Sequence, residues 1–321
     1  MTVLSGWLSS VASVVFQLVV TIAVTPVVVG ITRQARARLE GRAGAGVLQP
    51  WRDLRKLLLK QPVQADGTSL LQVVAPVVLL STSLMVCAQI PLVGSVALPG
   101  LPGDLFVVVS VLLVGTIALA VLGLDSGTAF GGMGSSRHMM IAALVEPTVL
   151  VAVFAVSIPA GSSALSSIMN HRLAAPSSIV SPASLMAVVA LAIAVLAETG
   201  RLPIDNPATH LELTMVHEAM VLESSGRDLA WVELGSWLRL SALLGLVANL
   251  LVPWGLATTA SVGALLVGAF ALLVKLFLAA AVLGGGEVFA AKVRLFRVPE
   301  LLAGSFALAF LAVTTSYLVA S

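Results

Sequence analysis

Two ionisable residues lie inside otherwise apolar stretches of the sequence, where a charge is costly. Glu146 lies about eight residues into the stretch 138–160, roughly 12 Å below the membrane surface, and a carboxylate there costs about 3 kcal/mol or more. Lys275 lies at a similar depth in the stretch 258–283. The two charges can form a structural ion pair. An intramembrane carboxylate followed by Pro147, which kinks the helix, instead favours a proton relay.

The segment AETGRLPIDNPATHLELTMVHEAMVLESSGRD, residues 197–228, carries many of the acids. Asn206 followed by Pro207 predicts the start of a helix. On that helix Glu212 and Glu223, eleven residues apart, lie within about 20° of one face, and apolar residues surround them. This pattern disfavours a solvated helix. It predicts a row of buried carboxylates whose pKa values are raised by desolvation, so that they carry protons near neutral pH.

The segment GGGEVFAAKVRLFRVPE, residues 284–300, places Glu287 and Arg294 seven residues apart on one face of a predicted short helix that ends at Pro299. Taken alone, these two residues would form an ion pair with a structural role only. The other acid-bearing segments start from the same face of the predicted bundle, which brings Glu287 into the same set. The predicted proton and charge relay comprises Glu146, Glu198, Asp205, Glu212, Glu218, Glu223, Lys275 and Glu287.

A second kind of site is predicted near residue 50. From Leu48 onward, Trp51, Leu54 and Leu58 recur at helical spacing and charged residues take the other side, which predicts an amphipathic helix in the membrane interface. Such a helix either anchors the chain to lipid headgroups or forms a docking surface for a partner protein, and this segment alone favours the lipid anchor.

These residues must be positioned by a membrane protein. The chain has 321 residues, of which 59% are hydrophobic and 10% charged, with a mean hydropathy of +1.08, whereas soluble domains are about 25% charged. The single cysteine, Cys87, excludes an internal disulfide and a cysteine-ligated metal site. His210 and His217 are seven residues apart, whereas a zinc-binding helix requires four. We therefore expect no metal or redox cofactor in this chain.

The charge-free stretches predict an all-α, single polytopic membrane domain over residues 1–321, without an internal repeat. The first apolar stretch is too long for a cleaved signal peptide and lacks a basic region before it. The Ser- and Pro-rich residues 161–182 predict an ordinary loop. Eight transmembrane helices are expected, at about 8–31, 69–91, 105–124, 138–160, 179–199, 233–252, 258–283 and 301–319.

Lysine and arginine are concentrated in the odd-numbered loops, and eight of the seventeen lie in loop 32–68. The positive-inside rule then places these loops in the cytoplasm and both termini outside. Acids also gather in the odd loops, although topology does not require them there. Amphipathic helices are expected in loops 1, 5 and 7, and loops 32–68 and 200–232 are the predicted docking site.

Four motifs in the polar segments are specific together: QPxxDxxKLLxK (49–60), GMGSSRHMM…EP (132–147), AETxRxPxD (197–205) and AKxRLFRVPE (291–300). They resemble the complex I membrane subunit that borders the quinone cavity (the NADH dehydrogenase subunit 1 family) and its relatives in membrane-bound [NiFe] hydrogenases. Quinone-type members continue the third motif as PFDLPEAE, whereas this chain reads PIDNPATH, so Ala208 and His210 replace two acids. That variant is similar to the formate hydrogenlyase and hydrogenase-4 membrane subunits.

The resemblance implies a non-catalytic subunit with no redox centre of its own. Its implied partners are [NiFe]-hydrogenase-like large and small subunits and a ferredoxin-like subunit, which hold the NiFe and iron–sulfur clusters, together with antiporter-like membrane subunits; no nucleic acid is involved. By the same resemblance, Glu146, Glu198, Glu212 and Glu223 match glutamates that lead charge from the redox module. The predicted docking residues are Arg42, Trp51, Asp53, Lys56, Arg137, Arg201, Arg294 and Arg297.

The sequence thus predicts the membrane-anchoring and ion-translocation coupling subunit of a formate hydrogenlyase-like or energy-converting hydrogenase complex in a prokaryotic inner membrane. Two alternatives stay open. One is a quinone-cavity subunit of a complex I-like dehydrogenase, and the other is a stand-alone ion transporter, which the lack of an inverted repeat disfavours.

Overall fold

The structure is a computed structural model that describes residues 2–65, 67–96, 103–205, 215–290, 293 and 297–320. The regular structure in these residues is helical, as expected for an all-α membrane protein. The eight longest helices are α1 (Thr2–Leu39), α3 (Leu71–Gln89), α4 (Leu105–Asp125), α5 (Ala129–Ser157), α7 (Pro182–Glu198), α9 (Gly226–Leu251), α10 (Val262–Phe289) and α11 (Val298–Ala320).

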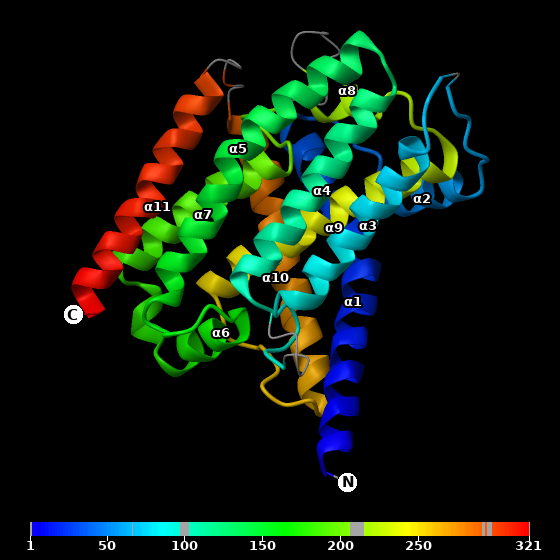
Figure 1. The fold of residues 1–321 in the computed structure, drawn as a ribbon. Coiled ribbons are helices and arrows are strands. Elements are labelled where there is room, and N and C mark those ends of the chain that lie inside the picture. The colour runs from blue at the N-terminus through cyan, green and yellow to red at the C-terminus, as the bar shows by residue number, and fades with distance from the viewer. Residues whose placement is uncertain are drawn as a thin grey trace.

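Seven of these helices are long and apolar enough to cross a membrane. The eighth, α7, has 17 residues, which is near the lower limit for a span. Both chain ends lie away from the end of the bundle that carries α2 (Gln49–Leu58) and α8 (His217–Val221) (Figure 1). We call the end with α2 and α8 the charged end and the other the opposite end. Termini on one side agree with an even number of crossings.

Several helices extend beyond the stretches expected from the sequence. α5 begins at Ala129 rather than near 138, because the Thr128 hydroxyl accepts a hydrogen bond from the Gly131 N–H (3.1 Å) and caps the helix. α9 begins at Gly226 and α10 continues to Phe289. The helices therefore carry charged residues in their end turns, which a count of charge-free residues leaves out.

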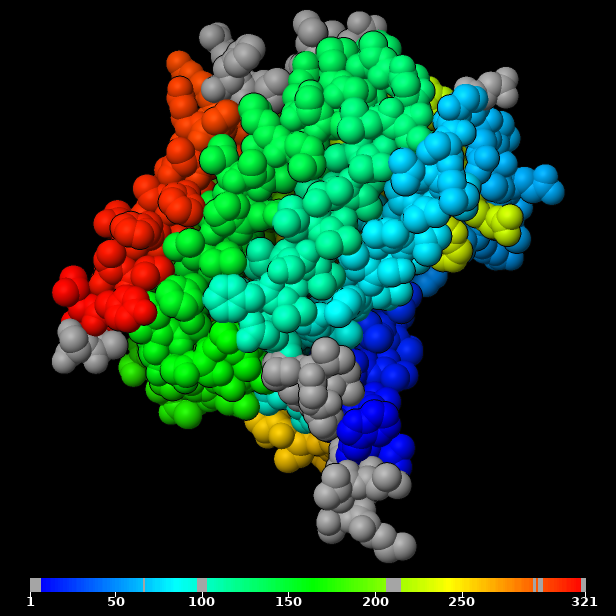
Figure 2. All heavy atoms as spheres, viewed as in Figure 1, coloured from blue at the N-terminus to red at the C-terminus, as the bar shows by residue number. Residues whose placement is uncertain are grey.

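Small residues allow the helices to pack closely. A Cβ atom at Gly284 of α10 would lie 2.4 Å from the Thr32 carbonyl oxygen of α1, and one at Gly235 of α9 would lie 3.3 Å from the Leu79 carbonyl carbon of α3. α5 packs against α4, α7 and α11, whereas α10 packs against α1 and α9. The first halves of α1 and α10 project past the other helices at the opposite end (Figures 1 and 2).

The short helices lie toward the two ends of this bundle (Figure 1). The amphipathic α2 is confirmed: Leu54 is buried against the bundle, while Trp51 is 36% exposed. The loop expected over 161–182 contains the helix α6 (Leu165–Ala174) and a 3₁₀ turn (Pro176–Ile179). α8 wedges between α4 and α5, where Ala219 and Met220 pack on the glycines of both helices.

Two expected amphipathic helices differ from prediction. The fifth-loop helix is described only as α8, which ends at Val221, so Glu223 lies in a turn rather than on a helix face shared with Glu212, which is outside the described residues. The next helix, α9, begins at Gly226. This position requires glycine, because its φ is +54° and the Gln61 carbonyl occupies the space that a Cβ atom would need.

The helix predicted in the seventh loop also differs from the structure. Glu287 belongs to the end of α10, and Arg294 lies outside the described residues. Pro299 stands in the first turn of α11 instead of ending a helix. A proline fits there because the first turn of a helix does not use its N–H groups internally.

The opposite end is held by neutral amides. The Gln17 side chain donates to the carbonyls of Cys87 (2.7 Å) and Ile90 (2.9 Å) and accepts from the N–H groups of Leu92 (3.2 Å) and Val93 (3.0 Å). Asn249 of α9 donates to the carbonyls of the same turn at Pro91 and Leu92. One turn after α3 is thereby tied to two other helices.

Candidate functional site

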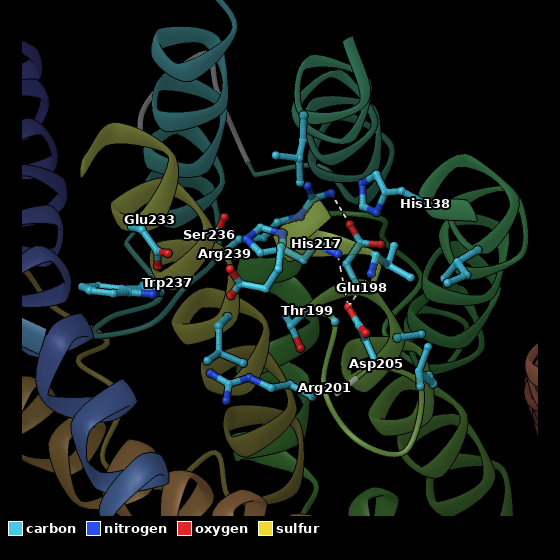
Figure 3. Close-up of a pocket in the computed structure, with 18 of the residues that line it drawn as sticks. His138, Glu198, Thr199, Arg201, Asp205, His217, Glu233, Ser236, Trp237 and Arg239 are labelled. Atoms are coloured by element: carbon cyan, nitrogen blue, oxygen red, sulfur yellow. Dashed lines mark hydrogen bonds and ion pairs between the residues drawn. The ribbon is translucent and has the colours of Figure 1, made fainter. Parts of the chain in front are cut away.

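A cavity of about 180 Å³ lies at the charged end. It is lined by the C-terminal parts of α1, α7 and α10, the N-terminal part of α9, and residues within 199–205 and 216–218 (Figure 3). Most of its polar lining is titratable. The lining includes the acids Glu198, Asp205, Glu218, Glu233 and Glu287, the bases Arg33, Arg36, Arg201 and Arg239, and the histidines His138 and His217.

The deepest charged contact joins Glu198, the last residue of α7, to Arg239, in the middle of α9. The guanidinium forms an ion pair with the Glu198 carboxylate, and the two residues are only 8% and 5% exposed. Arg239 also donates to the Leu112 carbonyl (2.8 Å) and the Thr116 hydroxyl (2.6 Å) of α4. One arginine thus ties three helices together around a buried carboxylate.

Glu146 and His138 border this contact from α5. Glu146 lies within electrostatic range of both Glu198 and Arg239 and interacts with the Thr116 hydroxyl. Its Oε1 atom is buried without a hydrogen-bond partner in the described part of the chain, and so is the Nε2 atom of His138. Both groups can exchange protons, and both have an unused position for one.

A second group of charged side chains, centred on Glu287, also lines the cavity. Glu287, at the end of α10, pairs with Arg201 (3.3 Å) and Arg36 of α1 (3.8 Å). Burial lowers the pKa of the Arg201 guanidinium, and the adjacent Glu287 carboxylate opposes that shift. Asp205 accepts from the N–H groups of Val216 (3.2 Å) and His217 (3.1 Å), which fixes the start of α8 over the cavity.

The α9 side of the cavity carries a third group. Glu233 interacts with His217 of α8, Arg33 of α1 and Trp237 of its own helix. The Arg33 guanidinium lies over the Trp237 ring, 5.8 Å from its centre, which is a cation–π distance. Figure 3 shows Glu233 and Trp237 on one side of the cavity and Glu198, Asp205 and His138 on the other.

The structure brings together much of the predicted relay. Glu198, Asp205, Glu218 and Glu287 line the cavity, and Glu146 borders its deepest contact. Two predicted members lie elsewhere in the described chain: Glu223 follows α8 and does not line the cavity, and Lys275 is in the middle of α10. Glu212 lies outside the described residues.

The expected pairing of Glu146 with Lys275 is wrong. The Lys275 ammonium donates to the Asn249 side chain (2.9 Å), whereas Glu146 lies beside Glu198. Equal depth in the membrane does not decide which helices are neighbours. α5 packs against α4, α7 and α11, and α10 packs against α1 and α9, so the two side chains belong to different parts of the bundle.

The predicted docking residues divide into surface and interior positions. Arg42, Trp51, Lys56 and Arg297 are exposed, and Asp53 is half-buried and accepts from Gln49 (3.0 Å). Arg137 is half-buried and points toward the Met215 carbonyl (3.5 Å). Arg201 lines the cavity, where Glu287 pairs with its charge. Arg294 is outside the described residues.

Sequence reasoning missed Arg239, Glu233 and His138. Arg239 was the most detectable, because it is a lone arginine inside the apolar stretch 233–252, and such a charge requires a partner. Glu233 and His138 stood at the first positions of expected spans, where a charged or polar residue needs no explanation. Only the packing of the helices shows that these three side chains line one cavity.

Chemically, the site is suited to holding and passing protons. Carboxylates and imidazoles line the cavity, and the Thr116 hydroxyl lies beside Glu146. Each of these groups can accept or release a proton at a fixed position. In the described ranges, no three histidine, cysteine or acidic side chains lie close enough together to hold a metal ion.

Comparisons with known proteins agree with this architecture. The sequence family described as NADH dehydrogenase matches residues 11–317. Formate hydrogenlyase subunit 4 of Escherichia coli (strain K12) is 35% identical over 298 residues, covering 92% of this chain and 95% of that protein. Hydrogenase-4 component C of the same strain is 31% identical over 82% of each chain.

A solved structure shows the same fold. A chain of the membrane-bound sulfane sulfur reductase (MBS), an archaeal respiratory membrane complex, superposes with a TM-score of 0.82 over 96% of this chain and 99% of that one, at 17% sequence identity.

Proposed function

Because the chain belongs to the NADH dehydrogenase family of membrane subunits, we propose that it couples electron transfer in partner subunits to ion movement in the membrane. It is a multi-pass inner-membrane subunit of a respiratory or energy-converting complex. Within that class we propose a formate hydrogenlyase-like or energy-converting hydrogenase complex, since two relatives that are more than 30% identical carry formate hydrogenlyase and hydrogenase names.

The observation that carries the coupling role is the charged cavity. It connects the charged end, where partner subunits would dock, with the buried Glu198–Arg239 pair and with Glu146. A structural cavity of this size would be filled more cheaply by apolar side chains, because each buried charge requires a compensating partner. Charges retained inside a membrane protein typically mark an ion path.

In this proposal the subunit itself carries out no redox chemistry. The partners would be a hydrogenase-like large subunit, a small subunit and a ferredoxin-like subunit, which would hold the nickel–iron and iron–sulfur centres, and antiporter-like membrane subunits. Redox events next to the cavity would change its protonation, and the acids would pass that change toward Glu146.

The test of this role uses the whole complex in sealed vesicles. Glu146→Gln keeps the shape of the side chain but cannot release a proton. We expect the complex to assemble and its redox turnover to remain measurable, while ion translocation falls at least tenfold. The matched control is Glu300→Gln, the same chemical change at an exposed acid, which should translocate normally. Normal translocation by an assembled Glu146→Gln complex would refute the role.

The cavity lining bears on the quinone-type alternative. Sites for small organic ligands are mostly apolar and usually exceed about 300 Å³, whereas this cavity is about 180 Å³ with five acids and four arginines. We therefore expect quinone-site inhibitors to leave turnover unchanged, with hydrogen or formate as substrate of the complex. Quinone-dependent turnover that these inhibitors abolish would favour the alternative.

A further inference from the structure

The deepest part of the cavity contains two carboxylates and one guanidinium. Glu198 of α7 forms an ion pair with Arg239 of α9, and Glu146 of α5 is within electrostatic range of both. From α4, only the Thr116 hydroxyl and the Leu112 carbonyl reach this point in the described residues. His138 of α5 is within electrostatic range of Arg239 and of His217 of α8.

Arg239 is fixed in place and does not swing freely between the two acids. Its Nη2 atom donates to the Leu112 carbonyl and to the Thr116 hydroxyl, and the residue is 5% exposed. Its ion pair is with Glu198, whereas the Glu146 Oε1 atom has no hydrogen-bond partner in the described ranges. The guanidinium therefore forms its ion pair with Glu198, whereas Glu146 feels the same charge only from a greater distance.

We propose that Arg239 is a positioning residue that keeps Glu198 ionised and so limits the Glu146–Glu198 pair to a single proton, which is held on Glu146. A carboxylate inside an apolar bundle that has no ion pair of its own and lies beside an ionised carboxylate takes up a proton, because desolvation and the like charge both disfavour its ionisation. A carboxylate in contact with a buried guanidinium stays ionised, because the arginine charge is permanent. Glu198 is then always available as an acceptor for the proton that Glu146 holds.

The Thr116 hydroxyl completes the arrangement. Its oxygen accepts from Arg239, and its single hydrogen can be directed to the Leu112 carbonyl (3.0 Å) or to Glu198 Oε1 (3.3 Å). It also interacts with Glu146. This hydroxyl can pass a proton when it gives its own hydrogen to Glu198 while its oxygen takes the proton of Glu146, and rotation about the C–O bond then restores its starting position.

The proposal rests on the proton path described under Proposed function, but its test counts protons at rest and needs no translocation. The intact complex is compared with variants by infrared spectroscopy of protonated carboxyl groups at neutral pH. Glu146→Gln should lose the signal of one protonated carboxyl group. Arg239→Gln should gain one protonated carboxyl group, which disappears again in Arg239→Gln/Glu198→Gln.

Arg239→Lys is the matched control, because it keeps a positive charge at the same position and should match the unmodified complex. If Arg239→Gln fails to assemble, Glu146→Gln still decides where the proton is held, because it leaves the pair of Glu198 and Arg239 intact. An unchanged signal in Glu146→Gln, or in assembled Arg239→Gln, would overturn the proposal. Failed translocation with these expected signals would contradict only the coupling role.

Discussion

The two ends of the bundle bury polar groups in opposite ways. At the charged end, the cavity joins five acids to four arginines and two histidines. At the opposite end, the buried polar groups include the neutral amides of Gln17 and Asn249, whose partners are backbone atoms and, for the Asn249 oxygen, the Lys275 ammonium. Both ends belong to the same apolar bundle, so the surroundings do not explain why one end uses titratable groups and the other neutral amides. The chemistry of the two kinds of group does.

An amide with every hydrogen-bonding position used fixes geometry and nothing else. It has no protonation state to change near neutral pH, and moving it would leave several backbone groups unpaired. A carboxylate next to an arginine also fixes geometry, but it can additionally gain or lose a proton. The comparison teaches that the amides at the opposite end only stabilise the structure. The charged groups at the charged end stabilise the structure and can also change their protonation.

One buried charge at the opposite end behaves like the amides. Arg172 of α6 is 3% exposed and donates to the Leu250 carbonyl, in the last turn of α9, and to the Ser184 hydroxyl (2.6 Å). A cation at a helix C-terminus is favourable. Burial lowers the pKa of Arg172 to about 10, so it stays charged at neutral pH. It is therefore a fixed charge that caps a helix.

The largest effect is expected from breaking the amide frame. Gln17→Leu leaves two carbonyls and two N–H groups without their partner, and each unsatisfied buried group costs about 1 to 3 kcal/mol. We expect a loss of about 4 kcal/mol or more, measured as a lower melting temperature and a lower yield of assembled complex. The complexes that do form should translocate normally.

The matched control is Gln72→Leu, another buried glutamine. Its Oε1 atom accepts no hydrogen bond within the residues described here, so its loss should cost far less. Equal destabilisation by the two variants would mean that the cost comes from side-chain volume rather than from hydrogen bonds.

The next effect tests whether charges at the cavity also hold structure. Glu287→Gln removes the partner of Arg201, and we expect a loss of about 3 kcal/mol, at the low end for a broken buried pair because the Arg201 side chain is 17% exposed. Arg201→Gln should cost a similar amount. The double variant should recover part of the loss, with a coupling energy of about 0.5 to 3 kcal/mol. Thermal denaturation of all four complexes measures this cycle, and additive losses would show that the pair is not coupled.

The spans were predictable from the sequence, but their neighbours were not. Apolar stretches located all eight long helices, because hydrophobic length alone decides that a segment can cross. The pairing of Glu146 with Lys275 was wrong because a sequence gives the depth of a residue along the membrane normal but does not show which helices are neighbours. Arg239 was hidden inside a stretch that otherwise read as a span. Glu223 was placed on a helix, but α8 ends at Val221, two residues before it.

A smaller effect is expected from the fixed charge at the opposite end. Arg172→Met removes two hydrogen bonds and the cap of α9 but also removes a buried charge, which offsets part of the cost. We expect a loss of about 1 to 2 kcal/mol in thermal denaturation and no change in translocation per assembled complex. A tenfold fall in translocation would contradict the division between the two ends.

The smallest effect concerns the outer surface of the charged end. Arg52 and Lys56 of α2 are exposed, and exposed charges add little to folding but steer association in a salt-dependent way. Arg52→Ala/Lys56→Ala should leave the melting temperature nearly unchanged and weaken capture of iron–sulfur subunits a few-fold, more strongly at low salt than at high salt. If α2 is only a lipid anchor, the same variant should instead reduce binding to vesicles of anionic lipid and leave subunit capture intact. A chain that purifies from its native host stable, monodisperse and free of such partners would contradict the docking role altogether, because the exposed cations would then have no protein to bind.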